Sequence, residues 1–232
     1  MKKGMALLVS MALMMSAAAA LAAGRTTVTQ EAFYVRPVSS YYAGEIYAEI
    51  TNTGDKPVVY NGGMIELYNP DGDAIESSNI YNCYPAILGP GETGYLYQTT
   101  YVKEAEERKY IDDYMLTVTG KAENEKVTVR MQSEGSYGEF KRSKYWTDYT
   151  VFALVTNDTD ELLREIRVVF ALFDESGNLL YADSVEPRYV GLPPGATIEV
   201  RQTVDSRIVE AWDAEGIQPA RIDTIAYVER EQ

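Results

Sequence analysis

An internal repeat limits the fold of this chain more than any other feature of its sequence. Three blocks recur in the same order, at an offset of 105 residues from Asn52 to Asn157 and of 104 residues from Gly91 to Gly195. Separate blocks at nearly constant spacing indicate a tandem duplication, and we place its boundary within 120–125. The paired blocks are 45–52 with 150–157, 65–72 with 170–177, and 88–91 with 192–195.

Each copy has the pattern of β structure, because apolar residues alternate with a period of two between segments rich in turn residues. The alternation places one set of apolar side chains on a single face of each strand. We therefore predict a core in each copy from these positions. The predicted core residues are Ile46, Ala48, Ile50, Ile65 and Leu67 in the first copy, and Val151, Ala153, Val155, Phe170 and Leu172 in the second.

Turn residues in each copy predict where the chain reverses. The segments 69–73 and 174–178 contain asparagine, aspartate and glycine in the order of hairpin turns. Pro-Gly corners at 90–91 and 194–195 precede further alternating segments. The strands expected after these turns are 93–101, 114–119, 197–204 and 223–229. Short strands of this spacing in a unit of about 105 residues are typical of an immunoglobulin-like β-sandwich.

One segment in each copy lacks the strand alternation. In 103–109, Glu104 precedes Arg108 by four residues, which is the favourable order for a helical ion pair. The segment 206–212 occupies the equivalent place. We therefore predict an all-β fold of two tandem immunoglobulin-like β-sandwich domains, at 24–121 and 126–232, each with a short helical insertion.

Residues 1–23 have the pattern of a secretory signal peptide: two lysines, an apolar stretch and a small-residue end at Ala20-Leu21-Ala22. Cleavage is expected near Ala22 or Ala23. The mature protein would then be extracytoplasmic, secreted or held at the cell envelope, with no transmembrane segment. An uncleaved leader retained as a membrane anchor is the alternative, because the apolar run approaches the ~20 residues of a spanning helix.

Composition excludes several classes of function. The net charge is -14, and it becomes -16 when the two leader lysines are removed, so the chain has little from which to build a nucleic-acid-binding face. There is no histidine, which excludes Ser-His-Asp and Cys-His catalysis and histidine-ligated metal sites. We predict no cofactor and no nucleic-acid partner.

The second copy resembles the FxLYD-type extracytoplasmic domains of bacteria. The resemblance rests on Phe170-Ala171-Leu172-Phe173-Asp174, preceded by Val155-Thr156-Asn157 and followed by Leu192-Pro193-Pro194-Gly195. The second copy has Phe173 in the tyrosine position, and the first copy departs from the motif at Ile65 and Asn69. Together the resemblance covers about 60 residues per copy. It implies a β-sandwich on a secreted or envelope protein and supplies no catalytic residues.

Three patterns suggest chemistry, and each has a simpler structural explanation. The turns 69–73 and 174–178 offer oxygen ligands for calcium but lack the spacing of an EF-hand loop, so we expect turns and no metal site. Asp112 and Asp113 are candidates for a carboxylate hydrolase, but adjacent strand residues point to opposite faces. Asn157-Asp158-Thr159 matches a glycosylation sequon. No catalytic residue is assigned, and the protein is not expected to be an enzyme.

Tyrosine is concentrated in the first copy, and the whole chain contains 19. Tyr95, Tyr97 and Tyr101 share one face of a predicted strand. The residues equivalent to the first two are Glu199 and Arg201, which belong on a solvent face, so we predict an exposed face suited to a sugar or a protein partner. The alternative is that these tyrosines pack against cross-strand neighbours.

Two further features remain. Cys83 is the single cysteine and is expected to be a buried apolar residue, with a reactive thiol or intermolecular disulfide as the alternative. The cluster 141–144 contains three basic residues. It could contact an anionic polymer or the acidic first copy, and the alternative is a solvated turn.

The pattern as a whole predicts a non-catalytic binding or assembly module of the envelope, with an envelope protein or polysaccharide as partner. A carbohydrate-binding module is the alternative, and a carboxylate hydrolase is a third.

Overall fold

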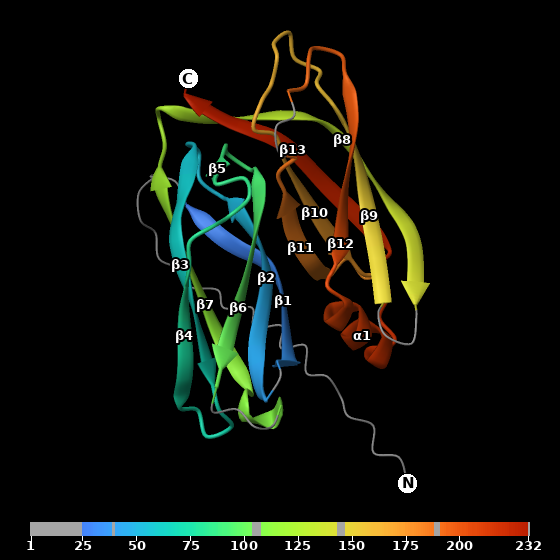
Figure 1. The fold of residues 1–232 in the computed structure, drawn as a ribbon. Helices are drawn as coiled ribbons and strands as arrows, with labels where there is room; N and C mark the ends of the chain where they lie inside the picture. Colours follow the sequence, from blue (N-terminus) through green and yellow to red (C-terminus); the bar gives the residue numbers. More distant parts are fainter. Residues whose placement is uncertain (1–24, 39, 104–107, 143–146, 188–190, 232) are drawn as a thin grey trace.

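The computed structural model describes residues 25–38, 40–103, 108–142, 147–187 and 191–231. Within these residues the chain forms thirteen β-strands, one α-helix and one 3-10 helix. The all-β fold class is therefore confirmed. The strands form two β-sandwiches that lie side by side, the first drawn in blue to green and the second in yellow to red (Figure 1).

Strands β1 to β7 form the first sandwich. One sheet has the order β1-β2-β6, and the facing sheet has β3 paired with β4, β5 and β7. The bounds are β1 Thr26–Val38, β2 Tyr41–Asn52, β3 Val58–Tyr68, β4 Ala74–Ile80, β5 Ile87–Leu88, β6 Thr93–Val102 and β7 Asp113–Ala122, with the 3-10 helix η1 at Arg108–Tyr110.

Strands β8 to β13 form the second sandwich, with the order β11-β10-β13-β8-β9-β12. The long strand β8 belongs to both sheets, because 126–131 pair with β13 and 132–142 pair with β9. The bounds are β8 Lys126–Arg142, β9 Thr147–Thr156, β10 Arg167–Phe173, β11 Leu179–Val185, β12 Thr197–Val204, α1 Ser206–Glu215 and β13 Arg221–Glu231.

The alternating apolar residues form the core of each sandwich. All ten predicted core residues are fully buried, so this prediction is confirmed. Alternation in strands β2, β3, β9 and β10 places these side chains between the two sheets of their sandwich.

Turn residues act as the sequence predicts. Gly72 and Gly177 have φ values of 84° and 83°, and the Asn69 and Asp174 amides each bond across their turn at 3.0 Å. Both segments close hairpins, β3 to β4 and β10 to β11. The strand expected at 197–204 is β12, and the other three expected strands fall within β6, β7 and β13.

Each sandwich has a buried asparagine with the same hydrogen bonds, Asn52 at the end of β2 and Asn157 directly after β9. Asn52 donates its side-chain amide to the carbonyls of Lys56 and Leu88 at 2.8 and 2.9 Å. Asn157 donates to the carbonyls of Glu161 and Leu192 at 2.8 and 2.7 Å. In both copies, therefore, the same asparagine side chain binds two other segments of the chain to the end of a strand.

The helical insertion is present in the second sandwich as α1, which begins after its N-cap Asp205 and ends at the left-handed Gly216. In the first sandwich, 104–107 lie outside the described residues, and η1 follows them. The leader at 1–23 also lies outside the described residues. The domain limits of 24–121 and 126–232 remain predictions, and the strands fall within 26–122 and 126–231.

Candidate functional site

One face of the first sandwich is covered by the second sandwich. It is the outer face of the β1-β2-β6 sheet, opposite to the core face. Cross-strand pairing arranges its residues in four rows, each read from β1 through β2 to β6. The rows are Gln30-Glu49-Tyr95, Ala32-Tyr47-Tyr97, Tyr34-Glu45-Thr99 and Arg36-Ala43-Tyr101.

Strand β11 and helix α1 of the second sandwich pack against this face. Tyr34 donates its hydroxyl to the Leu180 carbonyl at 3.0 Å and accepts a bond from Trp212 Nε1 at 3.0 Å. Gln30 Oε1 accepts a bond from the Leu179 amide at 2.9 Å. We call this contact the joint, comprising the four rows together with β11, α1 and Gln202.

Aromatic rings form the centre of the joint. The ring of Tyr47 lies 5.0 Å from the ring of Tyr181 between centroids, and 6.2 Å from the ring of Tyr34. Tyr47 and Tyr95 are buried within the apolar cluster of the second sandwich, although both belong to the first. The apolar cluster of the second sandwich therefore extends across the joint to these two tyrosines, whereas the core of the first sandwich is a separate cluster.

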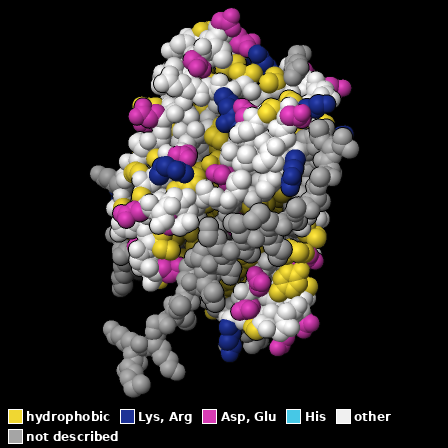
Figure 2. Space-filling model, turned by 180° about the vertical axis from the view of Figure 1, so that it is seen from behind, with side chains coloured by type: hydrophobic (Ala, Val, Ile, Leu, Met, Phe, Trp, Pro, Cys, Tyr) yellow, Lys and Arg dark blue, Asp and Glu magenta, His cyan; other side chains and the backbone are white. Residues whose placement is uncertain are grey.

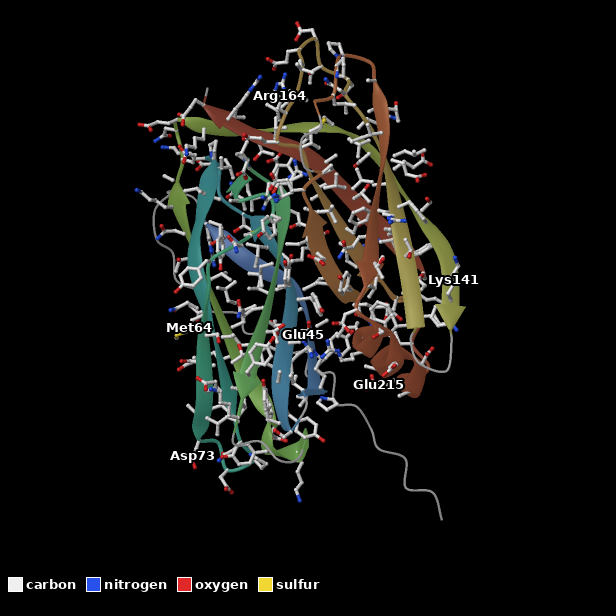
Figure 3. All side chains as sticks on the ribbon, viewed as in Figure 1. Glu45, Met64, Asp73, Lys141, Arg164 and Glu215 are labelled. Carbon is white, nitrogen blue, oxygen red and sulfur yellow. The ribbon has the colours of Figure 1, made fainter. Side chains whose placement is uncertain are left out.

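A polar cluster lies beside these rings. Glu45 is buried, pairs with Arg36, and accepts a bond from the Tyr47 hydroxyl at 3.0 Å. Figure 3 shows Glu45 on β2, on the side that faces the second sandwich. On the other side of the joint, Asp183 Oδ2 accepts a bond from the Tyr181 hydroxyl at 3.0 Å.

Burial changes the proton affinity of the acid groups in this cluster. It raises the pKa of the Asp183 carboxyl above its ordinary value, although hydrogen bonds from Ser184, Tyr181 and Tyr97 oppose the shift. Burial, reinforced by the nearby Asp183, also raises the pKa of Tyr97 to about 12. The Tyr97 hydroxyl therefore keeps its proton at neutral pH, as does that of Tyr181, which donates its hydrogen bond to Asp183.

A second set of contacts joins the sandwiches near the start of β8. Glu229 Oε1 accepts bonds from the amides of Ala86 and Ile87 at 2.7 and 3.2 Å. Thr128 donates its hydroxyl to the Ile87 carbonyl at 2.7 Å, and Arg130 donates to the Thr93 carbonyl at 3.0 Å. Contacts at these two separate places restrict rotation of one sandwich against the other.

The predicted tyrosine face is only partly exposed. Tyr95 is 5% exposed, so the expectation that it stands in water is wrong. The cause is the second sandwich, which covers Tyr95, whereas the equivalent Glu199 on β12 is exposed. Tyr97 and Tyr101 are 40% and 48% exposed and lie at the rim of the joint.

The rim also carries other aromatic groups. Tyr41 contacts Tyr101 edge to face at 6.2 Å between centroids. Tyr84 lies 6.4 Å from Tyr97, and the Arg167 guanidinium lies over the Tyr84 ring at 4.6 Å. The joint, Tyr84 and Arg167 could not be found from the sequence, because no pattern within one copy shows which face the other copy will cover.

The turns proposed as possible metal ligands use their polar atoms internally. Asn69 Oδ1 accepts bonds from the Asp71 and Asp73 amides at 3.0 and 2.8 Å. Asp174 accepts two bonds from Asn178, at 2.8 and 2.9 Å. Among the described residues, no group of three or more aspartate, glutamate, histidine or cysteine side chains is placed to hold a metal ion.

The other candidate residues lie apart from the joint. Asp112 and Asp113 are exposed at the start of β7. Asn157 of the sequon is fully buried, with its side-chain nitrogen engaged by two carbonyls. Cys83 is buried, as expected, and burial raises the pKa of its thiol.

The basic cluster 141–144 is only partly described. Lys141 is exposed near the end of β8, whereas 143–146 lie outside the described residues. On the face drawn in Figure 2, acidic and basic side chains are interspersed, and the basic ones do not gather into one area. No helix of the described part of the chain has the length and apolar character needed to cross a membrane.

Comparison with known proteins assigns no family to the chain. No protein-family model matches it, and no curated protein matches it. The solved structures that match include red sea bream transglutaminase, which matches over 88% of this chain with 10% sequence identity and a TM-score of 0.23. The chain spans 31% of the length of that transglutaminase.

Proposed function

We propose that this protein is a non-catalytic binding or assembly module of the cell envelope, with its contact surface at the rim of the joint. The observation that carries the proposal is the exposure of Tyr97 and Tyr101 beside a joint whose other aromatic residues are covered. Exposed tyrosine rings provide flat apolar area with a hydroxyl group, and such residues are enriched where proteins bind partners.

The location of this rim also supports the proposal. Tyr97 and Tyr84 belong to the first sandwich, whereas Arg167, whose guanidinium lies over the Tyr84 ring, belongs to the second. Both sandwiches therefore contribute to one surface, and the joint holds these contributions in a fixed relation. Extracytoplasmic location and membership of the FxLYD-type domains are part of the same proposal, supported by the leader and by the motif at 170–174.

The test is a double variant, Tyr41→Ala with Tyr101→Ala, in the mature protein. We expect it to bind isolated bacterial envelopes at least about tenfold more weakly, because aromatic hot spots commonly contribute 1.4 kcal/mol or more. Tyr81→Ala is the matched control, since Tyr81 is 76% exposed and follows β4, away from the rim. Equal binding by the double variant and the control would show that the contact surface lies elsewhere.

A carbohydrate-binding module is the second candidate, favoured by one observation. Tyr41 lies edge to face against the exposed Tyr101 at 6.2 Å between ring centroids, so two aromatic rings lie close together at the rim. A glycan array together with protease-treated envelopes separates the two candidates. Binding to a glycan, or binding that survives protease treatment, indicates a polysaccharide; loss after protease treatment indicates a protein.

A carboxylate hydrolase remains the third candidate and has the least support. Asp113 Oδ1 accepts a bond from the Tyr114 amide at 2.8 Å, and the Asp112 amide donates to the Tyr68 carbonyl at 2.9 Å. These bonds hold the pair at the edge of β7, where adjacent strand residues point to opposite faces.

A further inference from the structure

The apolar core of the second sandwich includes residues of the first sandwich, and this relation has no counterpart in the other direction. Tyr47 and Tyr95 are buried members of the second core, and Ala32, Tyr34 and Tyr84 pack against it. Among the described residues, every member of the first core and every apolar residue packed against that core lies in the first sandwich. The joint therefore completes the core of the second sandwich and adds nothing to the core of the first.

Strand β11 also depends on the first sandwich. It lies at one end of the six-stranded order, so no described strand pairs with its outer edge. The Leu179 amide on β11 donates to the Gln30 side chain at 2.9 Å, and the Leu180 carbonyl accepts a bond from the Tyr34 hydroxyl at 3.0 Å. Side chains of the first sandwich thus bind backbone groups of an edge strand, where such groups commonly lack a partner.

Helix α1 receives similar support. Its buried Trp212 donates the indole N–H to the Tyr34 hydroxyl at 3.0 Å, and its ring contacts the rings of Tyr149 and Tyr181. The ring of Tyr181 in turn packs against Tyr47 of the first sandwich. Separation of the sandwiches would remove the partner of the indole N–H and uncover the ring of Tyr181.

The contacts that the second sandwich makes near the start of β8 are of another kind. Glu229, Thr128 and Arg130 form hydrogen bonds with backbone groups within 86–93 of the first sandwich. None of these three residues belongs to the first core. The first sandwich therefore has its two facing sheets and its described core without any contribution from the second.

We propose that the first sandwich is an intramolecular template for the second: when the joint opens, the first sandwich keeps its fold and the second unfolds. Opening the joint uncovers core residues of the second sandwich and breaks the bonds to β11 and α1, and both losses destabilise that sandwich. In the first sandwich, the same event uncovers the outer face of a complete sheet. Separation of the sandwiches and unfolding of the second are thus one event, and the joint is not a hinge between two independent domains.

The test follows the unfolding of each sandwich in the full mature chain. Strands β3 and β10 are equivalent in the repeat, and each pairs with strands on both of its edges. Their amides therefore become open to hydrogen exchange when the sandwich around them unfolds. Pulsed hydrogen exchange at increasing urea concentrations gives one midpoint for β3 and one for β10.

Tyr47→Glu opens the joint from the outer face of the first sandwich, because it places a carboxylate in the buried contact beside Glu45. We expect the β10 midpoint to fall by at least about 1 M urea, and β3 to stay protected where β10 has lost its protection. Tyr81→Glu is the matched control, since Tyr81 is exposed and follows β4, away from the joint. It should move either midpoint by less than about 0.3 M.

Two variants of Ile65 weaken the first sandwich in steps, because this side chain is fully buried in the first core. The β3 midpoint should fall by about 0.5 M in Ile65→Val and by at least about 1 M in Ile65→Ala. In both variants we expect the β10 midpoint to lie at or below the β3 midpoint, because the second sandwich cannot outlast its template. This series decides the question if Tyr47→Glu does not fold.

Three results would overturn the proposal. They are a β10 midpoint above the β3 midpoint in any of these proteins, equal β10 midpoints in Tyr47→Glu and Tyr81→Glu, and simultaneous loss of β3 and β10 protection in a folded Tyr47→Glu. None of these measurements uses an envelope partner, so the proposal can fail while the proposed function stands.

Discussion

The joint makes a quantitative prediction at Tyr34, whose hydroxyl accepts from Trp212 and donates to the Leu180 carbonyl. A Tyr34→Phe change keeps the ring and removes only this hydroxyl. Each lost bond contributes about 1 kcal/mol, and each partner left unpaired in a buried site costs a further share. We therefore expect a loss of about 2–3 kcal/mol in the free energy of unfolding.

Urea denaturation of the mature protein measures this loss. With a slope of about 2 kcal/mol per molar, the midpoint should fall by about 1–1.5 M. Tyr81→Phe is the matched control: its hydroxyl accepts a bond from exposed Asn79 at 3.2 Å, and its removal should cost less than about 0.5 kcal/mol. Equal midpoints for Tyr34→Phe and Tyr81→Phe would refute the reasoning that the hydroxyl holds the joint together.

Three other predictions concern buried residues. Asn157→Ala should lower the free energy of unfolding by about 2–4 kcal/mol, against less than about 1 kcal/mol for the exposed turn variant Asn178→Ala, as urea denaturation would show. Cys83 should react with a thiol reagent only when urea unfolds the chain, because the native thiol is buried; rapid labelling without urea would contradict this. Tyr95→Glu should weaken the joint, measured as faster exchange of the Leu179 amide, because it buries a carboxylate near Glu49; wild-type exchange would contradict it.

The strands and turns within each copy could be predicted because local rules determine them. Ile46 and Val151 are buried because strand alternation turns them inward. Gly72 and Gly177 adopt positive φ because the hairpins require it. These features depend on neighbours a few residues away, so the sequence of one copy contains the information needed to predict them.

Two parts of the fold could not be predicted in this way. Strand β8 begins in one sheet and continues in the other, and a change of sheet leaves no distinct signal in a period-two pattern. The joint depends on how two complete sandwiches meet. Tyr95 and Glu199 occupy matching strand positions, yet Tyr95 is buried and Glu199 is exposed, because only the first sandwich has its outer face covered by β11 and α1.

This asymmetry explains why several tyrosines of the first copy lie in the joint. A surface covered by another domain needs apolar area, and it must also satisfy the polar groups that it buries. Tyrosine provides both: the rings of Tyr47 and Tyr34 pack in the joint while their hydroxyls bond Glu45 and the Leu180 carbonyl. The second copy carries Phe152 at the position of Tyr47, where no such acceptor is buried. Tyr34, Tyr47 and Tyr95 of the first copy therefore serve the contact between the copies, and Tyr97 and Tyr101 are exposed at its rim.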